Sequence, residues 1–243
     1  MGGDMKKIEK KIKDLYRDFF ITNDINPKTG EVKEYGFKTW KFASYPFIGS
    51  NYGDKGCKKI LFVGLDLGKD ESRGRILGFK EKREVVESMH NHIKTMNPNM
   101  SGTYITSIYF LQNWFFSNRW GLIKKSRSYK EGVRIFNINL LSFIALINLY
   151  KFVTKNRKRR SGGENRKHIF GKEKELQLLL DEIEVFNPDI LIFQSRDFLN
   201  QKYHCLFKEL KKAFKDMKLF IAPQPAYHGP RSPLHYLSRL KRK

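Results

Sequence analysis

The segment from Lys59 to Gly64 constrains the fold more than any other, because it is a continuous apolar run of strand length. Such a run is typical of a parallel strand whose two faces are both covered by helices. Ligands of parallel sheets bind beyond the carboxyl ends of the strands. The turn that follows, from Gly64 to Gly68, would therefore present the carboxylate of Asp66 where active sites are usually found.

Hydrophobic periodicity along the rest of the chain predicts strands that alternate with helices. We expect helices near residues 5–20, 80–96, 103–118, 173–186 and 198–215, and further strands at 134–141, 189–194 and 218–222. The apolar stretch from Leu140 to Leu149 suits a buried helix. This order predicts a three-layer α/β/α sandwich with a central, mainly parallel four-stranded sheet. We divide the chain into an N-terminal region, 1–57, packed on a core domain, 58–243, with a basic insertion at about 151–172.

The charge balance predicts a polyanionic partner. The chain has 48 Lys and Arg residues against 25 Asp and Glu residues, a formal net charge of +23 over 243 residues. Such an excess attracts nucleic acid through a term that depends on salt rather than on sequence. A generally adhesive basic protein is the alternative. The hydrophobic content of 40% is enough for a sizeable core, which argues against a disordered basic tail.

The number of cysteines and the hydropathy of the chain bear on metal binding, membrane insertion and localisation. The two cysteines, Cys57 and Cys205, cannot by themselves form a four-ligand zinc or iron–sulfur site, so we expect reduced, mostly structural thiols. We also predict that the protein holds no metal and no cofactor. No stretch of about 18 uncharged apolar residues occurs, and the start of the chain lacks an apolar signal region. We therefore expect a cytoplasmic protein that does not enter a membrane, and separately we expect a monomer.

The order of these parts resembles the uracil-DNA glycosylase superfamily over roughly residues 58–236. The segment Gly64-Leu-Asp-Leu-Gly68 is similar to the motif that ends the first strand of that family, with Asp66 where the family holds a water-activating Asp or Asn. The loop with His228 follows the last predicted strand, as a histidine loop does in the family. The run from Gly68 to Phe79 is similar to the pattern of the thermostable-type enzymes.

The chain departs from the family pattern in three ways. Leu67 stands where a proline usually follows the catalytic position, so the loop would be shaped differently. His228 lies further from the end of its strand than the family histidine does. The segment Pro223-Gln-Pro225 occupies the place where the family's histidine motif often begins. The four ligand cysteines of the iron–sulfur members are absent from the chain.

Cleavage of an N-glycosidic bond explains why these residue types suit the reaction. Positive charge develops on the deoxyribose and negative charge on the departing base. Asp66 would orient a water and stabilise the sugar cation, and His228 would donate to a carbonyl oxygen of the base. Asn139 or Asn137 would read the Watson–Crick edge of the base, and Asn139 is preferred because it lies nearer the predicted carboxyl end of its strand. An aspartate in such a turn also commonly caps the local backbone, so that alternative stays open.

The remaining candidates surround the reacting nucleotide. Aromatic residues that could stack on an extruded base include Phe79, Tyr45, Phe47 and Tyr52. The residues expected to bind substrate are Gly64, Leu65, Gly68, Phe79, Asn137, Asn139 and Gln194. Those expected to contact DNA phosphates are Lys155, Arg157, Lys158, Arg159, Arg160, Arg231 and Ser232.

The function predicted from the sequence is therefore a monofunctional DNA glycosylase that excises a flipped uracil or modified pyrimidine, in repair or in defence against phage with modified DNA. A non-catalytic nucleic-acid-binding protein is the first alternative. A metal-dependent nuclease is the second, because Asp189 precedes an apolar strand, although Gln194-Ser-Arg196 provides no second carboxylate where a two-metal site would need one.

Overall fold

The computed structural model describes residues 3–32, 39–54, 57–66, 72, 74–94, 107, 138–155, 167–222 and 241–242. Within these residues the chain folds into a six-stranded sheet with helices on both faces. The strands of this sheet are β2 (Phe47–Ile48), β3 (Ile60–Asp66), β4 (Ile144–Tyr150), β6 (Ile190–Phe193), β7 (Lys218–Ile221) and β8 (Lys241–Arg242). The helices are α1 (Gly3–Thr22), α2 (Phe79–Lys94), α6 (Lys172–Phe186) and α7 (His204–Ala213), with 3₁₀ turns η1 (Ile138–Phe143), η2 (Arg196–Leu199) and η3 (Gln201–Tyr203).

The sheet has the order β2-β4-β3-β6-β7-β8. Its four central strands, β4, β3, β6 and β7, are parallel, and the two outer strands run antiparallel to their neighbours. This confirms the predicted α/β fold with a mainly parallel sheet. The two antiparallel outer strands were not predicted. A separate two-stranded sheet joins β1 (Trp40–Phe42) to β5 (Phe152–Thr154).

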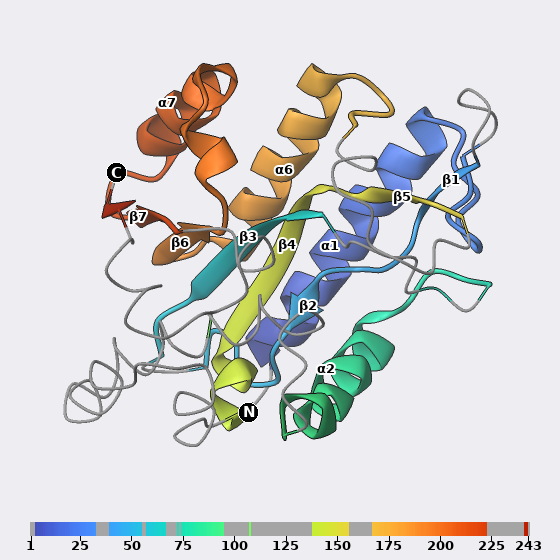
Figure 1. The fold of residues 1–243 in the computed structure, drawn as a ribbon, viewed down its shortest axis with the longest axis horizontal. Coiled ribbons are helices and arrows are strands. Elements are labelled where there is room, and N and C mark those ends of the chain that lie inside the picture. The colour runs from blue at the N-terminus through green and yellow to red at the C-terminus, as the bar shows by residue number, and fades with distance from the viewer. Residues whose placement is uncertain are drawn as a thin grey trace.

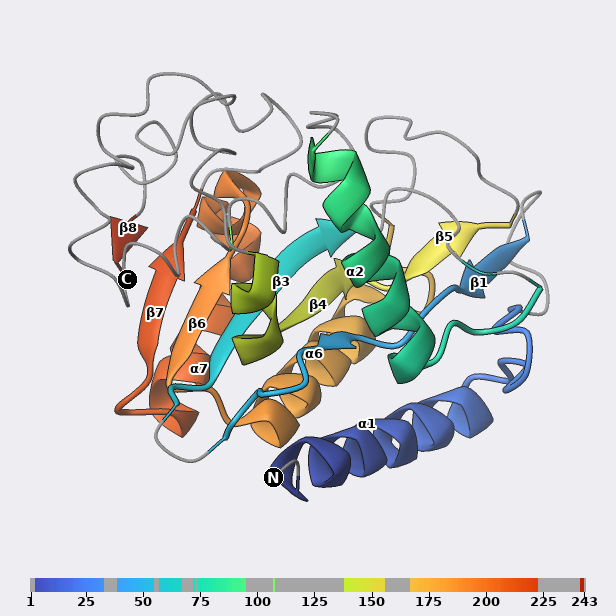
Figure 2. The ribbon, with the colours of Figure 1, turned by 90° about the horizontal axis from the view of Figure 1, so that it is seen from below.

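Helices α6 and α7 lie on one face of the sheet and α2 lies on the other (Figure 1). Helix α1 packs along α6 (Figure 2). At the same edge of the molecule, Arg83 of α2 donates to Glu9 of α1 at 2.5 Å and to the backbone carbonyl of Ile48 in β2 at 3.3 Å. The N-terminal region is therefore tied to both helical layers and supplies a strand to the sheet.

The described helices form near positions where the apolar periodicity predicted them, and the helix predicted at 103–118 lies outside the described residues except for Ser107. In α1 the buried side chains are Ile8, Ile12, Tyr16 and Phe20, which recur every four residues and so share one face. Helix α6 ends at Asn187, whose φ of 42° is the left-handed conformation that commonly terminates helices and that asparagine tolerates.

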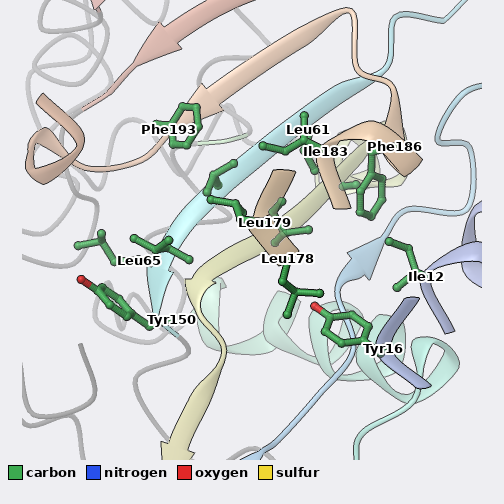
Figure 3. Close-up of a cluster of buried hydrophobic side chains, with 14 of the residues drawn as sticks. Ile12, Tyr16, Leu61, Leu65, Tyr150, Leu178, Leu179, Ile183, Phe186 and Phe193 are labelled. Carbon is green, nitrogen blue, oxygen red and sulfur yellow. The ribbon is translucent and has the colours of Figure 1, made fainter. Parts of the chain in front are cut away.

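The main core fills the layer between the sheet and α6. Leu61 of β3 meets Leu178, Leu179 and Ile183 of α6 in this layer, and all four side chains are at most 2% exposed (Figure 3). Burial of each such side chain contributes about 1.5–3 kcal/mol to folding. At the amino edge of the sheet, the residues that precede β3 and β6 are joined by a hydrogen bond. The backbone N–H of Lys59 donates to Asp189 Oδ2 at 2.8 Å.

The prediction was wrong for residues 138–149, and residues 134–137 lie outside the described part of the chain. Residues Ile138–Phe143 form the 3₁₀ turn η1, and the strand β4 occupies Ile144–Tyr150, where a buried helix was expected. Both faces of β4 are covered, so its apolar run lacks the alternation that marks a half-exposed strand. A short apolar run of this kind does not distinguish a buried strand from a buried helix.

Candidate functional site

The parallel strands define a topological switch point between β3 and β6. After β3 the chain passes through α2 on one face to reach β4, whereas after β6 it passes through α7 on the other face to reach β7. Adjacent strands whose connections leave to opposite faces mark the usual ligand site of an open parallel sheet. Asp66 is the last residue of β3, so it lies at the carboxyl edge of the sheet beside this point.

Gly64 is required by its neighbour in β4. Gly64 pairs in register with Asn148, and a Cβ atom at Gly64 would lie 2.5 Å from Asn148 Oδ1. The absence of a side chain at Gly64 therefore lets the Asn148 amide rest directly on the β3 backbone. Strand β3 continues to Asp66, so Gly64 is a strand residue rather than the start of a turn.

Gln194 follows β6 on the other side of β3. Its backbone N–H donates to the carbonyl of Val63 at 2.8 Å, and its side-chain Nε2 donates to Ser107 Oγ at 3.2 Å. Gln194 is 1% exposed. Gly64, Asp66, Asn148 and Gln194 thus come from three adjacent parallel strands, and we call them the switch-point cluster.

The structure separates Asn139 from this cluster. Asn139 lies in η1, before β4, and therefore at the amino edge of the sheet. Ile60 pairs with Ile144 and Asp66 pairs with Tyr150, so the two edges are separated by the length of the strand, about 20 Å. The prediction that Asn139 closes a strand next to Asp66 was wrong, because the strand begins after this residue instead of ending at it.

Two other predicted substrate-binding side chains are buried in the core. Leu65 is 5% exposed and lies beside Tyr150 on the α6 side, so only its backbone is available to a ligand (Figure 3). Phe79 is 4% exposed and stacks on Tyr45, with ring centroids 4.9 Å apart and an interplanar angle of 30°. A base could reach Phe79 only after Tyr45 moved, which makes Tyr45 the better candidate for stacking. Tyr52 is fully buried and packs edge-on against Phe186.

Several predicted residues lie outside the described part of the chain. They are Gly68, Asn137, Arg157, Lys158, Arg159, Arg160, His228, Arg231 and Ser232. Lys155 is described: its side chain is 44% exposed and pairs with Glu31 at 2.5 Å. Exposed pairs of this kind contribute little to stability and exchange readily with other anions.

A pocket opens at the outer edge of β4, next to the switch-point cluster. Its empty volume is about 310 Å³, part of which is open to solvent. Asn148 lines this pocket together with Tyr45, which precedes β2, Phe47 of β2 and Lys82 of α2. The other lining residues are Tyr16, Phe42, Ser44, Pro46, Leu146, Ile147, Lys151 and Glu182. The pocket therefore combines aromatic walls with buried polar groups, as ligand sites commonly do.

Three polar side chains meet at the base of the pocket. Tyr16 donates to Glu182 Oε1, and the Lys151 ammonium pairs with Glu182 Oε2 and donates to the backbone carbonyl of Asn148. The side chains of Lys151 and Glu182 are 3% and 0% exposed. We call Tyr16, Lys151 and Glu182 the buried charged cluster. Lys151 begins the segment that was predicted as a basic insertion at about 151–172, and the structure buries its side chain.

Burial dominates the electrostatics of this cluster. It raises the pKa of Glu182 above its ordinary value, although Lys151 and the Tyr16 hydroxyl both oppose the shift. It also raises the pKa of Tyr16 well above that of a free tyrosine, and the neighbouring Glu182 carboxylate adds to the increase. Tyr16 therefore remains a protonated donor across the physiological range.

Within the described part of the chain, no group of three or more His, Cys, Asp and Glu residues is arranged to hold a metal ion. Asp189, the residue on which the nuclease alternative depended, lies at the amino edge and bonds to the Lys59 backbone. None of the helices in the described ranges is long and apolar enough to cross a bilayer.

No protein-family model, no curated protein and no solved structure matches this chain. The site is therefore defined by its own geometry.

The sequence contained signals for the residues that the prediction missed. Asn148 is the one polar residue in the run from Ile144 to Leu149. Glu175 and Glu182 fall seven residues apart on the buried stripe of α6, with Leu178, Leu179, Ile183 and Phe186. A polar residue at an apolar position of a periodic pattern indicates a buried partner.

Proposed function

We propose that the chain is a monofunctional DNA glycosylase that hydrolyses the N-glycosidic bond of a flipped uracil or modified pyrimidine. The observation that carries the proposal is the position of Asp66 at the carboxyl end of β3, two residues after Gly64, which pairs with Asn148 of β4. A carboxylate and an amide at the switch point of a parallel sheet supply an anion for the sugar and a hydrogen-bonding group for the base.

In this proposal three side chains act on the nucleotide. Asp66 orients the attacking water and stabilises the positive charge that develops on the deoxyribose. The Asn148 amide, which has both a donor and an acceptor, takes the base-reading role first assigned to Asn139. His228 donates to a carbonyl oxygen of the departing base. No metal or cofactor takes part.

The partner in this proposal is DNA, and the positive charge of the chain holds it. The net charge of +23 favours contact with a phosphate backbone. The basic residues from Lys155 to Arg160, with Arg231 and Ser232, would hold the duplex while one nucleotide is extruded. Extrusion costs a few kcal/mol, which phosphate contacts must offset. We also propose that the protein is monomeric and cytoplasmic and acts in base-excision repair or against phage with modified DNA.

The experiment that tests the proposal is alkali-revealed formation of abasic sites. Purified protein is incubated with duplexes that contain uracil, a thymine mismatch, hydroxymethylcytosine or glucosylated hydroxymethylcytosine. We expect strand breaks after alkali with at least one of these bases. Asp66→Ala and His228→Ala should each abolish the breaks while leaving DNA binding intact.

Asp189→Ala is the matched control, because it removes an aspartate from the opposite edge of the same sheet. Its rate of base release should equal that of the unmodified protein. Inactivity of the unmodified protein on every duplex, with DNA binding retained, would favour a non-catalytic DNA-binding protein. Strand cutting that needs magnesium and no alkali would favour the nuclease.

A further inference from the structure

The ion pair between Lys151 and Glu182 is not explained by stability. Both side chains are almost fully excluded from water. The desolvation of two buried charges commonly offsets their attraction, and apolar replacement of such a pair is often neutral or stabilising. A fold that needed only a filled core would be served equally well by apolar residues at these positions.

The buried charged cluster draws three separate parts of the chain together. Tyr16 comes from α1, Glu182 from α6, and Lys151 directly follows β4. The carboxylate of Glu182 accepts from Tyr16 on one oxygen and pairs with Lys151 on the other. The ring of Tyr16 also packs edge-on against that of Tyr45, a pocket residue, with the ring centroids 5.6 Å apart. The Lys151 ammonium therefore has little freedom to move.

Lys151 transmits this constraint to Asn148. Its ammonium donates to the Asn148 carbonyl, while the Asn148 side chain rests on the backbone of Gly64. Asn148 is thus fixed from both its backbone and its side chain. A recognition amide must be held in this way, since a displacement of about 1 Å at a reacting site can lower a rate by about a hundredfold.

We propose that Lys151, Glu182 and Tyr16 are positioning residues that hold the Asn148 amide in register with the base. This inference rests on the proposed glycosylase function and names the device that sets base recognition at that site. It places the determinants of base recognition on α1 and α6, which lie outside the carboxyl edge of the sheet.

The charge-free double variant Lys151→Met/Glu182→Leu separates positioning from stability. We expect its urea midpoint to fall by no more than the loss of one buried hydrogen bond, that of Tyr16, because no buried charge is left without a partner. We expect KM for the preferred duplex to rise at least tenfold, with a smaller change in kcat and with unchanged affinity for undamaged DNA. A double variant with unchanged KM would overturn the inference.

Glu175→Gln is the matched control. Glu175 lies on the same helix and is also 0% exposed, but it accepts from His168 Nδ1 and from the Phe170 N–H, each at 3.0 Å. This variant alters an equally buried carboxylate that makes no contact with Lys151. Its KM should stay within twofold of the unmodified protein. An equal rise in KM for Glu175→Gln would mean that any disturbance of α6 acts on the site, which would refute specific positioning.

A second measurement does not depend on catalysis. In protein labelled with ¹⁵N-asparagine, the side-chain NH₂ signals of Asn148 are assigned from their loss in Asn148→Asp. Tyr16→Phe and the double variant should shift these signals, whereas Glu175→Gln should not. If no base is released from any duplex, the proposed function fails but the NMR comparison still decides the positioning. Unmoved Asn148 signals in both variants would overturn the inference.

Discussion

The contact between Gly64 and Asn148 predicts a variant that loses activity without losing stability. In Gly64→Ala the new methyl group would lie 2.5 Å from Asn148 Oδ1 and 3.8 Å from the nearest other residue, at the Ile147 carbonyl oxygen. The amide oxygen must retreat by about 1 Å to reach ordinary contact, which costs about 0.5–1.5 kcal/mol in an off-rotamer side chain. Replacing a strand glycine by alanine stabilises the folded state by about 0.5–1 kcal/mol, because alanine loses less backbone entropy on folding. The free energy of unfolding should therefore change by less than about 1 kcal/mol.

The displaced amide should nevertheless lower base release by about a hundredfold. Urea unfolding followed by fluorescence measures the first quantity, and single-turnover excision measures the second. Gly49→Ala is the control, because its methyl group would lie 2.3 Å from the Ser142 carbonyl oxygen and 2.4 Å from that of Leu141. These backbone atoms cannot rotate away, so we expect a loss of at least about 1–3 kcal/mol with normal activity per folded molecule. Full activity in Gly64→Ala, or a stability loss equal to that of Gly49→Ala, would refute the reasoning.

Three further predictions follow from described contacts. Asp189→Ala removes the acceptor for the Lys59 N–H and should lower the unfolding free energy by about 1 kcal/mol; an unchanged urea midpoint would contradict it. Burial raises the pKa of Glu182 above its ordinary value of 4.5, so protonation favours the folded state. The stability of the unmodified protein relative to Glu182→Gln should therefore be greatest below pH 4.5 and fall as the pH rises through the folded pKa; a difference that grows with pH would show the opposite shift. Lys155→Ala should weaken binding to all DNA sequences alike and reduce the slope of log affinity against log salt by about 0.9, measured by anisotropy; an unaltered slope would exclude Lys155 from phosphate contact.

The elements with strong periodicity or clear boundaries could be predicted from the sequence. Helices α1, α2 and α6 and strands β3, β6 and β7 lie within a few residues of their predicted bounds. In each case the buried stripe or the apolar run is bounded by polar or turn-forming residues, such as Asn187 and Pro188 between α6 and β6. The position of Asp66 at a carboxyl edge followed from β3 alone, because one parallel strand is enough to define that edge.

The position of the asparagine could not be predicted in the same way. Residues 138–150 are almost uniformly apolar, so no periodic pattern indicates where the strand begins and ends. Which of the asparagines lies at the same edge of the sheet as Asp66 therefore could not be predicted. The actual partner of Gly64, Asn148, is identified only by strand register, which local sequence does not encode. The two-residue strand β2 and the burial of Lys151 likewise depend on contacts made by distant parts of the chain.

The hydrogen bond between Tyr16 and Glu182 joins residues that are 166 positions apart. A ribosome adds about 5–20 residues per second, so Tyr16 is made on the order of ten seconds before its acceptor. During synthesis the apolar face of α1 has no α6 to pack against, so it stays exposed or is covered by a chaperone until α6 has been made. Contacts so distant in sequence also slow folding, because the intervening chain must lose entropy before they form. The docking of α1 onto α6 should therefore be a late step of folding, although α1 is the first helix to be made.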